Sequence, residues 1–232
     1  MAGTIFQDSA TSLRLWFYAI YLMSSTRCGI SAKQLERELG VTYKTAWRMF
    51  NKIRSLMMQD GEGPFGGTVE ADETYVGGKR RGKVGRPGAG DSKKVPVFGI
   101  AERGKDGKLG RIAAMKIPDA RAHTLISSLA QRVLPASIIY TDEYQPYLTL
   151  GKRGYTHKRV HHTQKVYVKG DVHTQTVDGF WALVKNGISG VYHGVSAKHL
   201  QAYLDEYAFR YNNSGDRCGM FNAMLSRVQK TS

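Results

Sequence analysis

TVEADETYVGGKRRGK, residues 68–83, joins a strand-like apolar run to a dense basic stretch, and the run itself carries three acidic residues. These acids are Glu70, Asp72 and Glu73. Two interpretations are open. In the first, the run is an exposed strand edge whose charged side chains face solvent. In the second, a carboxylate of the run holds a metal ion and the basic stretch binds a polyanion beside it.

The composition of the chain favours a polyanionic partner. Its 232 residues, 41% of them hydrophobic, are enough for one large domain or two smaller ones. The net charge of +15 predicts attraction to nucleic acid or to an anionic membrane. The longest apolar run, Leu15–Met23, is far shorter than the roughly 20 residues of a membrane span, so no membrane partner is expected. Cys28 and Cys218 match no metal or redox spacing, which favours a reduced, cytoplasmic protein.

Residues 1–62 predict a helical region that contains a helix-turn-helix. A mostly buried helix is expected over residues 12–23. Ser31 and Gln34 then form a capping-box pattern, and Gly40 ends the helix that they begin. The inward-facing residues of this helix are Leu35 and Leu39.

A second helix of this region is predicted after Thr42, which can cap it, and apolar residues recur along it at helical spacing. These apolar residues are Ala46, Phe50, Ile53 and Met57. The outward face would carry Tyr43, Lys44, Arg48, Lys52 and Arg54. Such a face can meet phosphates and base edges of DNA, with Lys44, Arg48 and Lys52 as the DNA-binding candidates. The alternative is an ordinary helical hairpin with a solvated basic face.

Residues 63–213 predict a second region with strands first and helices after them. The Gly-rich segment 60–67 marks the boundary, and strand patterns follow in 67–77, 95–103, 110–117, 137–143 and, more weakly, near 157–162. Helices are expected over 119–134, with Asp119 as a possible cap, and over 175–187 and 196–212. This order predicts a mixed sheet flanked by helices, an α/β fold. Residues 214–232 are expected to form a C-terminal tail.

Two aspartates fall where catalytic groups of such sheets tend to lie. Asp72 lies within the first strand, and Asp142 follows the buried run Ser137–Tyr140, where a parallel strand would emerge into a loop. Asp142 also fits a simple turn before the next element. The two together, in a strongly basic chain, favour a catalytic or metal-binding role.

The segment 77–94 is a basic loop rich in glycine, with seven Lys or Arg residues. Each Lys or Arg that meets a phosphate releases counterions, so DNA binding through this loop would depend strongly on salt. The alternative is a solvated, flexible insertion. The DNA-binding candidates are Lys79, Arg80, Arg81, Lys83 and Arg86.

Five blocks of the sequence resemble, in the same order, the DDE-type insertion-sequence transposases of the ISXO2-like group. They are GTIFQDSATSLRLWFYAIYLMSS, ISAKQLERELGVTYKTAWRMFNKIR, VEADETYVGGK, YTDEYQPY and GVYHGVSAKHLQAYLDEYAFRYNN. The resemblance covers nearly the whole chain. It implies an RNase H-like catalytic domain in which three carboxylates bind two divalent ions, Mg²⁺ or Mn²⁺.

The resemblance assigns the three carboxylates to Asp72, Asp142 and Asp178. The family generally has Glu at the third position and Asn where this chain has Gln175, so the third carboxylate here is one methylene shorter. Two ions held roughly 3.5–4 Å apart tolerate little misplacement, which makes this departure important. Asp178 also fits an acid in a first helical turn, favoured by the helix dipole. His173 is a further candidate near the metal ions or the scissile phosphate.

Family members usually begin with a Cys-rich zinc ribbon, and this chain starts just after the place where that ribbon would end. It contains no CxxC pair, so no structural zinc is expected. Recognition of the element's ends would be impaired in a form without the ribbon.

The resemblance implies a transposase that cleaves and transfers DNA strands of an insertion sequence in a metal-dependent reaction. Two alternatives stay open, a catalytically impaired DNA-binding protein derived from a transposase and a hydrolytic RNase H-like nuclease. The expected partner is double-stranded DNA, as element ends and as target, bound by a homodimer or larger assembly. The expected location is the bacterial cytoplasm, with association to the nucleoid on DNA.

Overall fold

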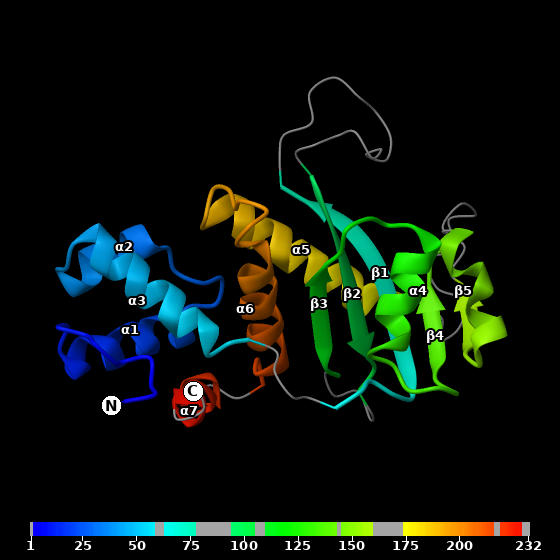
Figure 1. The fold of residues 1–232 in the computed structure, drawn as a ribbon, viewed down its shortest axis with the longest axis horizontal. Coiled ribbons are helices and arrows are strands. Elements are labelled where there is room, and N and C mark those ends of the chain that lie inside the picture. Colours follow the sequence, from blue (N-terminus) through cyan, green and yellow to red (C-terminus); the bar gives the residue numbers. More distant parts are fainter. Residues whose placement is uncertain are drawn as a thin grey trace, which may run out of the picture.

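The computed structural model describes residues 2–58, 63–77, 94–104, 110–142, 145–159, 174–215 and 219–228. Figure 1 shows a helical part beside a sheet with helices on both faces. The helical part begins with α1 (Leu13–Ser25), α2 (Ala32–Leu39) and α3 (Tyr43–Ser55). The strands are β1 (Thr68–Val76), β2 (Val95–Glu102), β3 (Ile112–Lys116), β4 (Ile138–Thr141) and β5 (Thr156–Arg159). The other elements are α4 (Ala122–Ala130), the 3-10 helix η2 (Gln145–Arg153), α5 (Gln175–Gly190), α6 (Leu200–Asn212) and α7 (Gly219–Arg227).

The sheet is mixed, with the strand order β3-β2-β1-β4-β5. β1 is antiparallel to β2 and β2 to β3, whereas β1 is parallel to β4 and β4 to β5. The predicted α/β class, the mixed sheet and all five strands are therefore confirmed.

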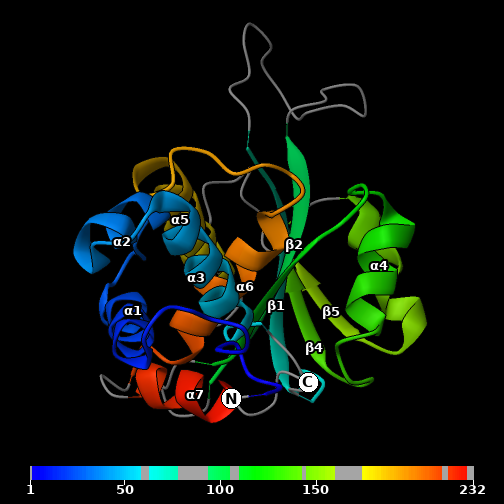
Figure 2. The same cartoon turned by 60° about the vertical axis from the view of Figure 1, so that its left-hand side comes forward.

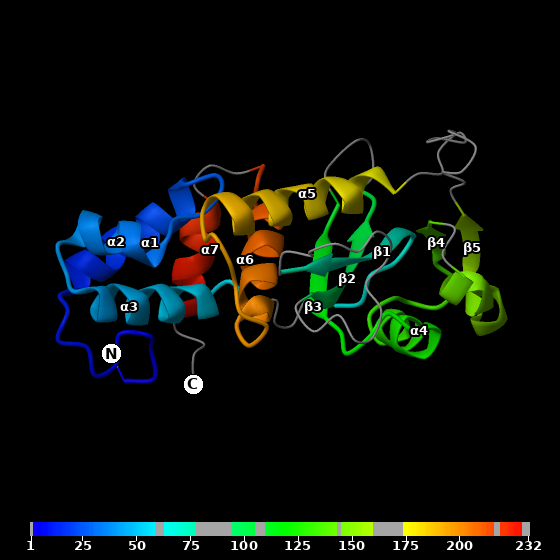
Figure 3. The same ribbon diagram turned by 90° about the horizontal axis from the view of Figure 1, so that it is seen from above.

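The two faces of the sheet are covered by different helices, as Figure 3 shows with α5 and α4 on opposite sides. Successive residues of a strand point to opposite faces, so each strand contributes to two cores. Val69, Ala71 and Phe98 pack in the core that includes the α4 residues Leu125 and Leu129. The opposite core contains Val76, Val97 and Ala101 of the sheet together with residues of α5 and α6, among them Val177, Phe180, Trp181, Leu204 and Tyr207.

Helix α6 closes the edge strand β3 through two amide side chains. Gln201 accepts a hydrogen bond from Lys116 N (2.8 Å) and donates one to Ala114 O (3.0 Å). Asn212 accepts from Ile112 N (2.8 Å) and donates to Ile112 O (3.0 Å). Because these are the groups that a further strand would use, α6 satisfies an edge that would otherwise be open to pairing with another chain.

The helical part has the local structure that the sequence predicts. Ser31 Oγ accepts from Gln34 N (3.1 Å) and Thr42 Oγ1 from Thr45 N (3.4 Å), which confirms both caps. Gly40 ends α2 with φ 62°, a left-handed conformation that favours glycine. The apolar residues predicted to face inward are buried: Leu35, Leu39, Ala46, Phe50, Ile53 and Met57.

The segment 214–232, predicted as a tail, contains the helix α7, which packs with α1 in the helical core. Met224 of α7 is fully buried there. The position of the cap before α4 also differs from the prediction. The cap position is Arg121, and Asp119 instead accepts hydrogen bonds from Arg121 N and Thr124 Oγ1 just before the helix.

Arg54 was predicted to lie on the outward face of α3, and that prediction is wrong. Its side chain is 1% exposed, and its Nε donates to Glu206 Oε2 of α6 at 2.9 Å. The guanidinium lies between the rings of Phe50 (3.9 Å) and Tyr203 (3.7 Å). A long cationic side chain can be buried in this way when a carboxylate and aromatic faces replace water. Arg54 thereby links α3 to α6, which lie next to each other in Figure 2.

Candidate active site on the α5 face of the sheet

Asp72 lies in the middle of the central strand β1, on the face that α5 covers. It pairs with Gly99 of β2, and paired residues of adjacent strands point to the same face. A Cβ at Gly99 would lie 2.6 Å from the Trp181 ring and 3.1 Å from Val177. Glycine at this position therefore lets α5 approach the sheet directly beside Asp72.

The carboxylates of Asp142 and Asp178 act electrostatically on that of Asp72. Burial, followed by the carboxylates of Asp142 and Asp178, raises the pKa of Asp72 to about 7. The Trp181 indole and the Lys185 ammonium act in the opposite sense, although the indole N–H makes no hydrogen bond of normal geometry in the described structure. Asp142 directly follows β4, the parallel neighbour of β1. The fold thus brings together residues from a strand, a strand end and a helix.

Asp178 lies in the first turn of α5, and a neighbouring residue orients its carboxylate. The hydroxyl of Thr174, a buried residue, donates to Asp178 Oδ2 at 3.0 Å. The carboxylate itself is exposed. Asp178 also has the position in which an acid interacts favourably with the helix dipole. The location of Asp178 therefore agrees both with a metal ligand and with an acid that only stabilises the start of the helix.

The chemistry of this group suits a hard divalent cation, because carboxylate oxygens are the ligands that Mg²⁺ and Mn²⁺ prefer. The mutual repulsion that raises the pKa of Asp72 would be relieved by such an ion. Among the described residues, however, no three His, Cys, Asp or Glu side chains are close enough to hold one ion together. In a site with two ions, each ion can be held by two of the carboxylates, so the proposed ligand set does not need all three on one ion.

The other acids of the opening stretch have different partners. Glu70 is fully buried on the same face as Asp72 and accepts hydrogen bonds from Arg103 Nε, Thr176 and Val177. Glu73 points to the α4 face, where the hydroxyl of Tyr147 donates to its carboxylate. Neither acid is therefore the solvent-facing strand charge of the first interpretation.

The predicted DNA-binding residues divide into three groups. Lys44 and Arg48 are exposed on α3, as predicted, and Arg48 also contacts Ser9 (3.4 Å). Lys52 is partly buried, and its ammonium donates to the backbone carbonyls of Ile5 (3.0 Å) and Gln7 (3.3 Å), so it anchors the N-terminal segment. The remaining DNA-binding candidates lie outside the described residues: Lys79, Arg80, Arg81, Lys83 and Arg86. The catalytic candidate His173 also lies outside them.

Lys158 is a basic residue of this face that the sequence did not single out. It pairs with Tyr140, which pairs with Glu70, so all three point to the α5 face. Lys158 is exposed on the outermost strand, β5, with its ammonium 5.9 Å from the centre of the Tyr140 ring. The weak strand pattern near residues 157–162 predicts a strand here, but the face of each residue depends on the pairing of β5 with β4.

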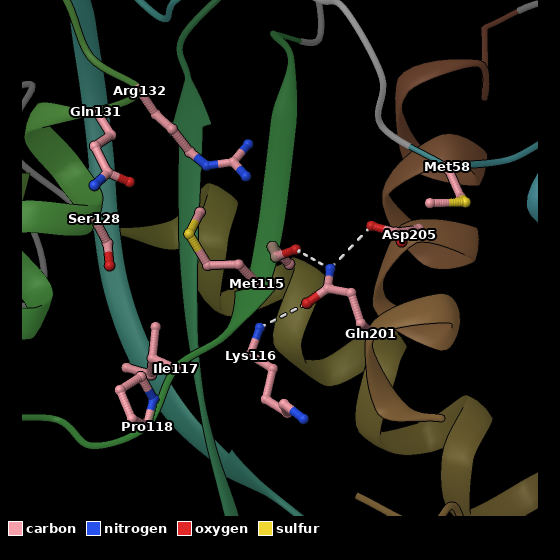
Figure 4. Close-up of a pocket in the computed structure, with 11 residues that line it drawn as sticks. Met58, Met115, Lys116, Ile117, Pro118, Ser128, Gln131, Arg132, Gln201 and Asp205 are labelled. Atoms are coloured by element: carbon pink, nitrogen blue, oxygen red, sulfur yellow. Dashed lines mark hydrogen bonds between the residues drawn. The ribbon is translucent and has the colours of Figure 1, made fainter. Parts of the chain in front are cut away.

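A cavity of about 430 Å³ lies apart from the aspartates, beside the edge strand β3. Figure 4 shows Gln201 and Asp205 of α6 at one side of it and Ser128, Gln131 and Arg132 at the other. Gln201 Nε2 donates to Asp205 Oδ1 (3.0 Å) as well as to β3, so these polar groups already have protein partners. None of the candidate site residues lines this cavity.

The chain is similar to a protein from a transposable element and to a protein described as transposase-like. One is an uncharacterised protein in the transposable element ISH50 of Halobacterium salinarum, 33% identical over 222 residues that cover 90% of this chain and 72% of that protein. The other is an uncharacterised transposase-like protein of Haemophilus influenzae, 26% identical over 104 residues that cover 45% of this chain and 83% of that protein.

Two solved structures are more remote. A pre-cleavage Mos1 transpososome matches with a TM-score of 0.34 and 13% identity, over 85% of this chain and 74% of that chain. A Mos1 strand transfer complex matches with a TM-score of 0.37 and 11% identity, over 92% and 75%. Among the residues that the structure describes, no helix is both long and apolar enough to cross a membrane.

Residues 64–212, most of the chain, match the ISXO2-like transposase domain. This range contains the whole sheet, α5 and the three aspartates. Because this domain matches most of the chain, and the ISH50 protein is similar over nine-tenths of the chain, the chain belongs to the ISXO2-like transposase family.

Proposed function

We propose that the protein catalyses metal-dependent cleavage of DNA strands and their transfer during movement of an insertion sequence. Asp72, Asp142 and Asp178 are the proposed ligands of two divalent ions, Mg²⁺ or Mn²⁺. The observation that carries the proposal is the placement of these residues: Asp72 lies on the α5 face of the central strand, Asp142 follows the parallel neighbour β4, and Asp178 lies in the first turn of α5. Burial, followed by the carboxylates of Asp142 and Asp178, raises the pKa of Asp72 to about 7, which agrees with this placement.

In the proposed reaction, bound divalent ions would activate the attacking hydroxyl and offset the charge that builds on the phosphate. The chain's own contribution is to hold and orient the ligands. Asp72 is fixed by the central strand, and Thr174 holds one oxygen of Asp178. Lys158, exposed on the same face, is placed to contact a DNA phosphate, and we assign the same role to the basic loop residues 79–86.

We propose α2 and α3 as a helix-turn-helix that binds DNA. The support is the short helix pair joined at Gly40, with Tyr43, Lys44 and Arg48 exposed on the second helix. Lys52 would contribute less than the sequence suggests, because its ammonium is held by backbone carbonyls. Paired element ends call for at least two copies of the chain, so the proposed active form is a homodimer or larger.

One observation favours a second candidate, a DNA-binding protein with impaired catalysis. No group of three His, Cys, Asp or Glu side chains in the described residues is arranged to hold one ion, and the third carboxylate is Asp where the family generally has Glu. Such a protein would occupy its DNA sites without cutting them.

Nicking of supercoiled plasmid in Mn²⁺ or Mg²⁺ separates these candidates. The wild type is compared with Asp142→Asn and Asp178→Ala, and DNA binding by each is measured as a control for folding. Nicking by the wild type alone, with equal binding by all three, would establish the carboxylate site. Equal binding without nicking, also on the element's own ends, would favour the impaired protein. Joining of the cut 3′ ends to target DNA then distinguishes a transposase from a hydrolytic nuclease.

A further inference from the structure

Glu70 connects the central strand to the first turn of α5. Its side chain is fully buried. One carboxylate oxygen accepts from the backbone N–H groups of Thr176 (2.9 Å) and Val177 (3.2 Å). The other accepts from the Thr176 hydroxyl and from Arg103 Nε, at 2.9 and 2.8 Å.

These bonds replace a cap that α5 lacks. The first turn of a helix has N–H groups without helical partners, and a side chain at the cap position usually satisfies them. Thr174 occupies that position but caps no backbone group, because its hydroxyl donates to Asp178. Glu70, about a hundred residues away in the sequence, supplies the missing acceptor and places a negative charge at the positive end of the helix dipole.

The residues on either side of this link are the proposed metal ligands. Asp72 follows Glu70 by two positions in the same strand, so both side chains point to α5. Asp178 follows Val177 in the helix. The distance between these two aspartates is therefore set by a short path through the carboxylate of Glu70.

We propose that Glu70 is a positioning residue, which holds α5 so that Asp178 and Asp72 can bind divalent cations together. The proposal rests on the proposed function. A purely structural cap would stabilise the protein without affecting the affinity for cations. Loss of a neighbour that orients metal ligands typically weakens metal binding about 10- to 100-fold.

The test uses the full chain with Glu70→Gln, which keeps the size of the side chain but removes its charge and one acceptor. Glu73→Gln is the matched control, because Glu73 is a buried acid of the same strand whose side chain contacts η2 and not α5. Hydrogen exchange of the Thr176 and Val177 amides reports the link itself. Titration with Mn²⁺, followed by electron paramagnetic resonance of the free ion, reports cation affinity without any DNA.

We expect Glu70→Gln to accelerate exchange of both amides at least about tenfold and to weaken Mn²⁺ binding at least about tenfold, with Glu73→Gln like wild type in both. Unchanged exchange, or faster exchange with unchanged Mn²⁺ affinity, would overturn the proposal. If the wild type binds no Mn²⁺, the proposed function itself fails. Faster amide exchange in Glu70→Gln would then show that Glu70 caps α5 and has no role in cation binding. Should Glu70→Gln not fold, Thr176→Ala removes one of the bonds and is read by the same two measurements.

Discussion

Replacing Glu206 with Gln is expected to destabilise the whole protein, because this carboxylate joins α3 to α6, the helix that closes the edge of the sheet. Glu206 is fully buried and accepts hydrogen bonds from Arg54, Arg210 and Tyr192 at 2.8–3.0 Å. Arg210 also donates to the backbone carbonyls of Met23 and Thr26 next to α1. A neutral Gln leaves two buried guanidinium groups without a counter-charge.

The expected cost follows from this burial. Removing one partner of a buried ion pair costs about 3–5 kcal/mol, a large part of the roughly 5–15 kcal/mol that holds a typical domain folded. In urea, with a slope of about 2 kcal/mol/M, the unfolding midpoint of Glu206→Gln would fall by roughly 1.5–2.5 M.

The pH dependence gives a second measure of the same interaction. Burial alone would raise the pKa of Glu206, but the neighbouring guanidinium groups of Arg210 and Arg54 hold it below its usual value. Its stabilising effect is then complete above the pKa of an unfolded Glu, about 4.3, and is lost as the pH falls through the lower folded pKa. The stability difference between wild type and Glu206→Gln should therefore shrink in acid.

Glu36→Gln is the control for this experiment, because Glu36 pairs with the exposed Lys33 on the surface of α2. Such a surface pair contributes about 0–1 kcal/mol. Urea unfolding followed by circular dichroism is the assay for both variants. A loss below about 1 kcal/mol for Glu206→Gln, equal to that of the control, would refute the reasoning.

Four further predictions follow from the site and the sheet. Gly99→Ala forces the Trp181 ring away from the sheet, which should lower the free energy of unfolding by about 1–3 kcal/mol, measured by thermal unfolding, and should also lower the rate of nicking. Gly179→Ala is the control, because the position has open space around it, and it should change neither quantity. Lys158→Ala should reduce the slope of log K for DNA binding against log salt by about 1. Replacing Gln201 and Asn212 by Leu leaves the β3 edge groups unpaired and should cause self-association, measured by light scattering. Asp178→Glu lengthens the third carboxylate and should tighten Mn²⁺ binding, whereas Asp178→Asn should weaken it.

Local patterns in the sequence were enough for most of the elements. Short runs with a strand pattern predict the five strands, the fifth of them weakly, and the caps Ser31 and Thr42 with the stop at Gly40 predict α2 and α3. These features depend on residues a few positions apart, and their physics is contained in the local sequence. The same cannot be said of α7, because a helix of this length depends on tertiary packing for its stability.

The features that the sequence did not predict depend on pairs of residues that are far apart in the sequence. Arg54 is a basic residue at a helical position that also fits a charged surface, and only Glu206, 152 positions away, makes its burial possible. The role of Glu70 could likewise not be predicted, because its hydrogen-bond donors Thr176 and Val177 are about a hundred positions away in the sequence. In each case the charge can be buried because its partner lies on another element, and local residue spacing does not identify that partner.

The shorter third carboxylate can be related to the approach of α5 to the sheet. An Asp at position 178 reaches less far than a Glu, so the helix must lie close to β1 for Asp178 to act together with Asp72. Two features of the chain bring it close: Gly99, which has no side chain to hold the Trp181 ring away, and Glu70, which binds the first turn of the helix. Among the described residues, no three His, Cys, Asp or Glu side chains are grouped closely enough to hold one ion. For this reason the extra methylene of Asp178→Glu is expected to increase cation affinity; a decrease would mean that the close approach of α5 already suits an Asp.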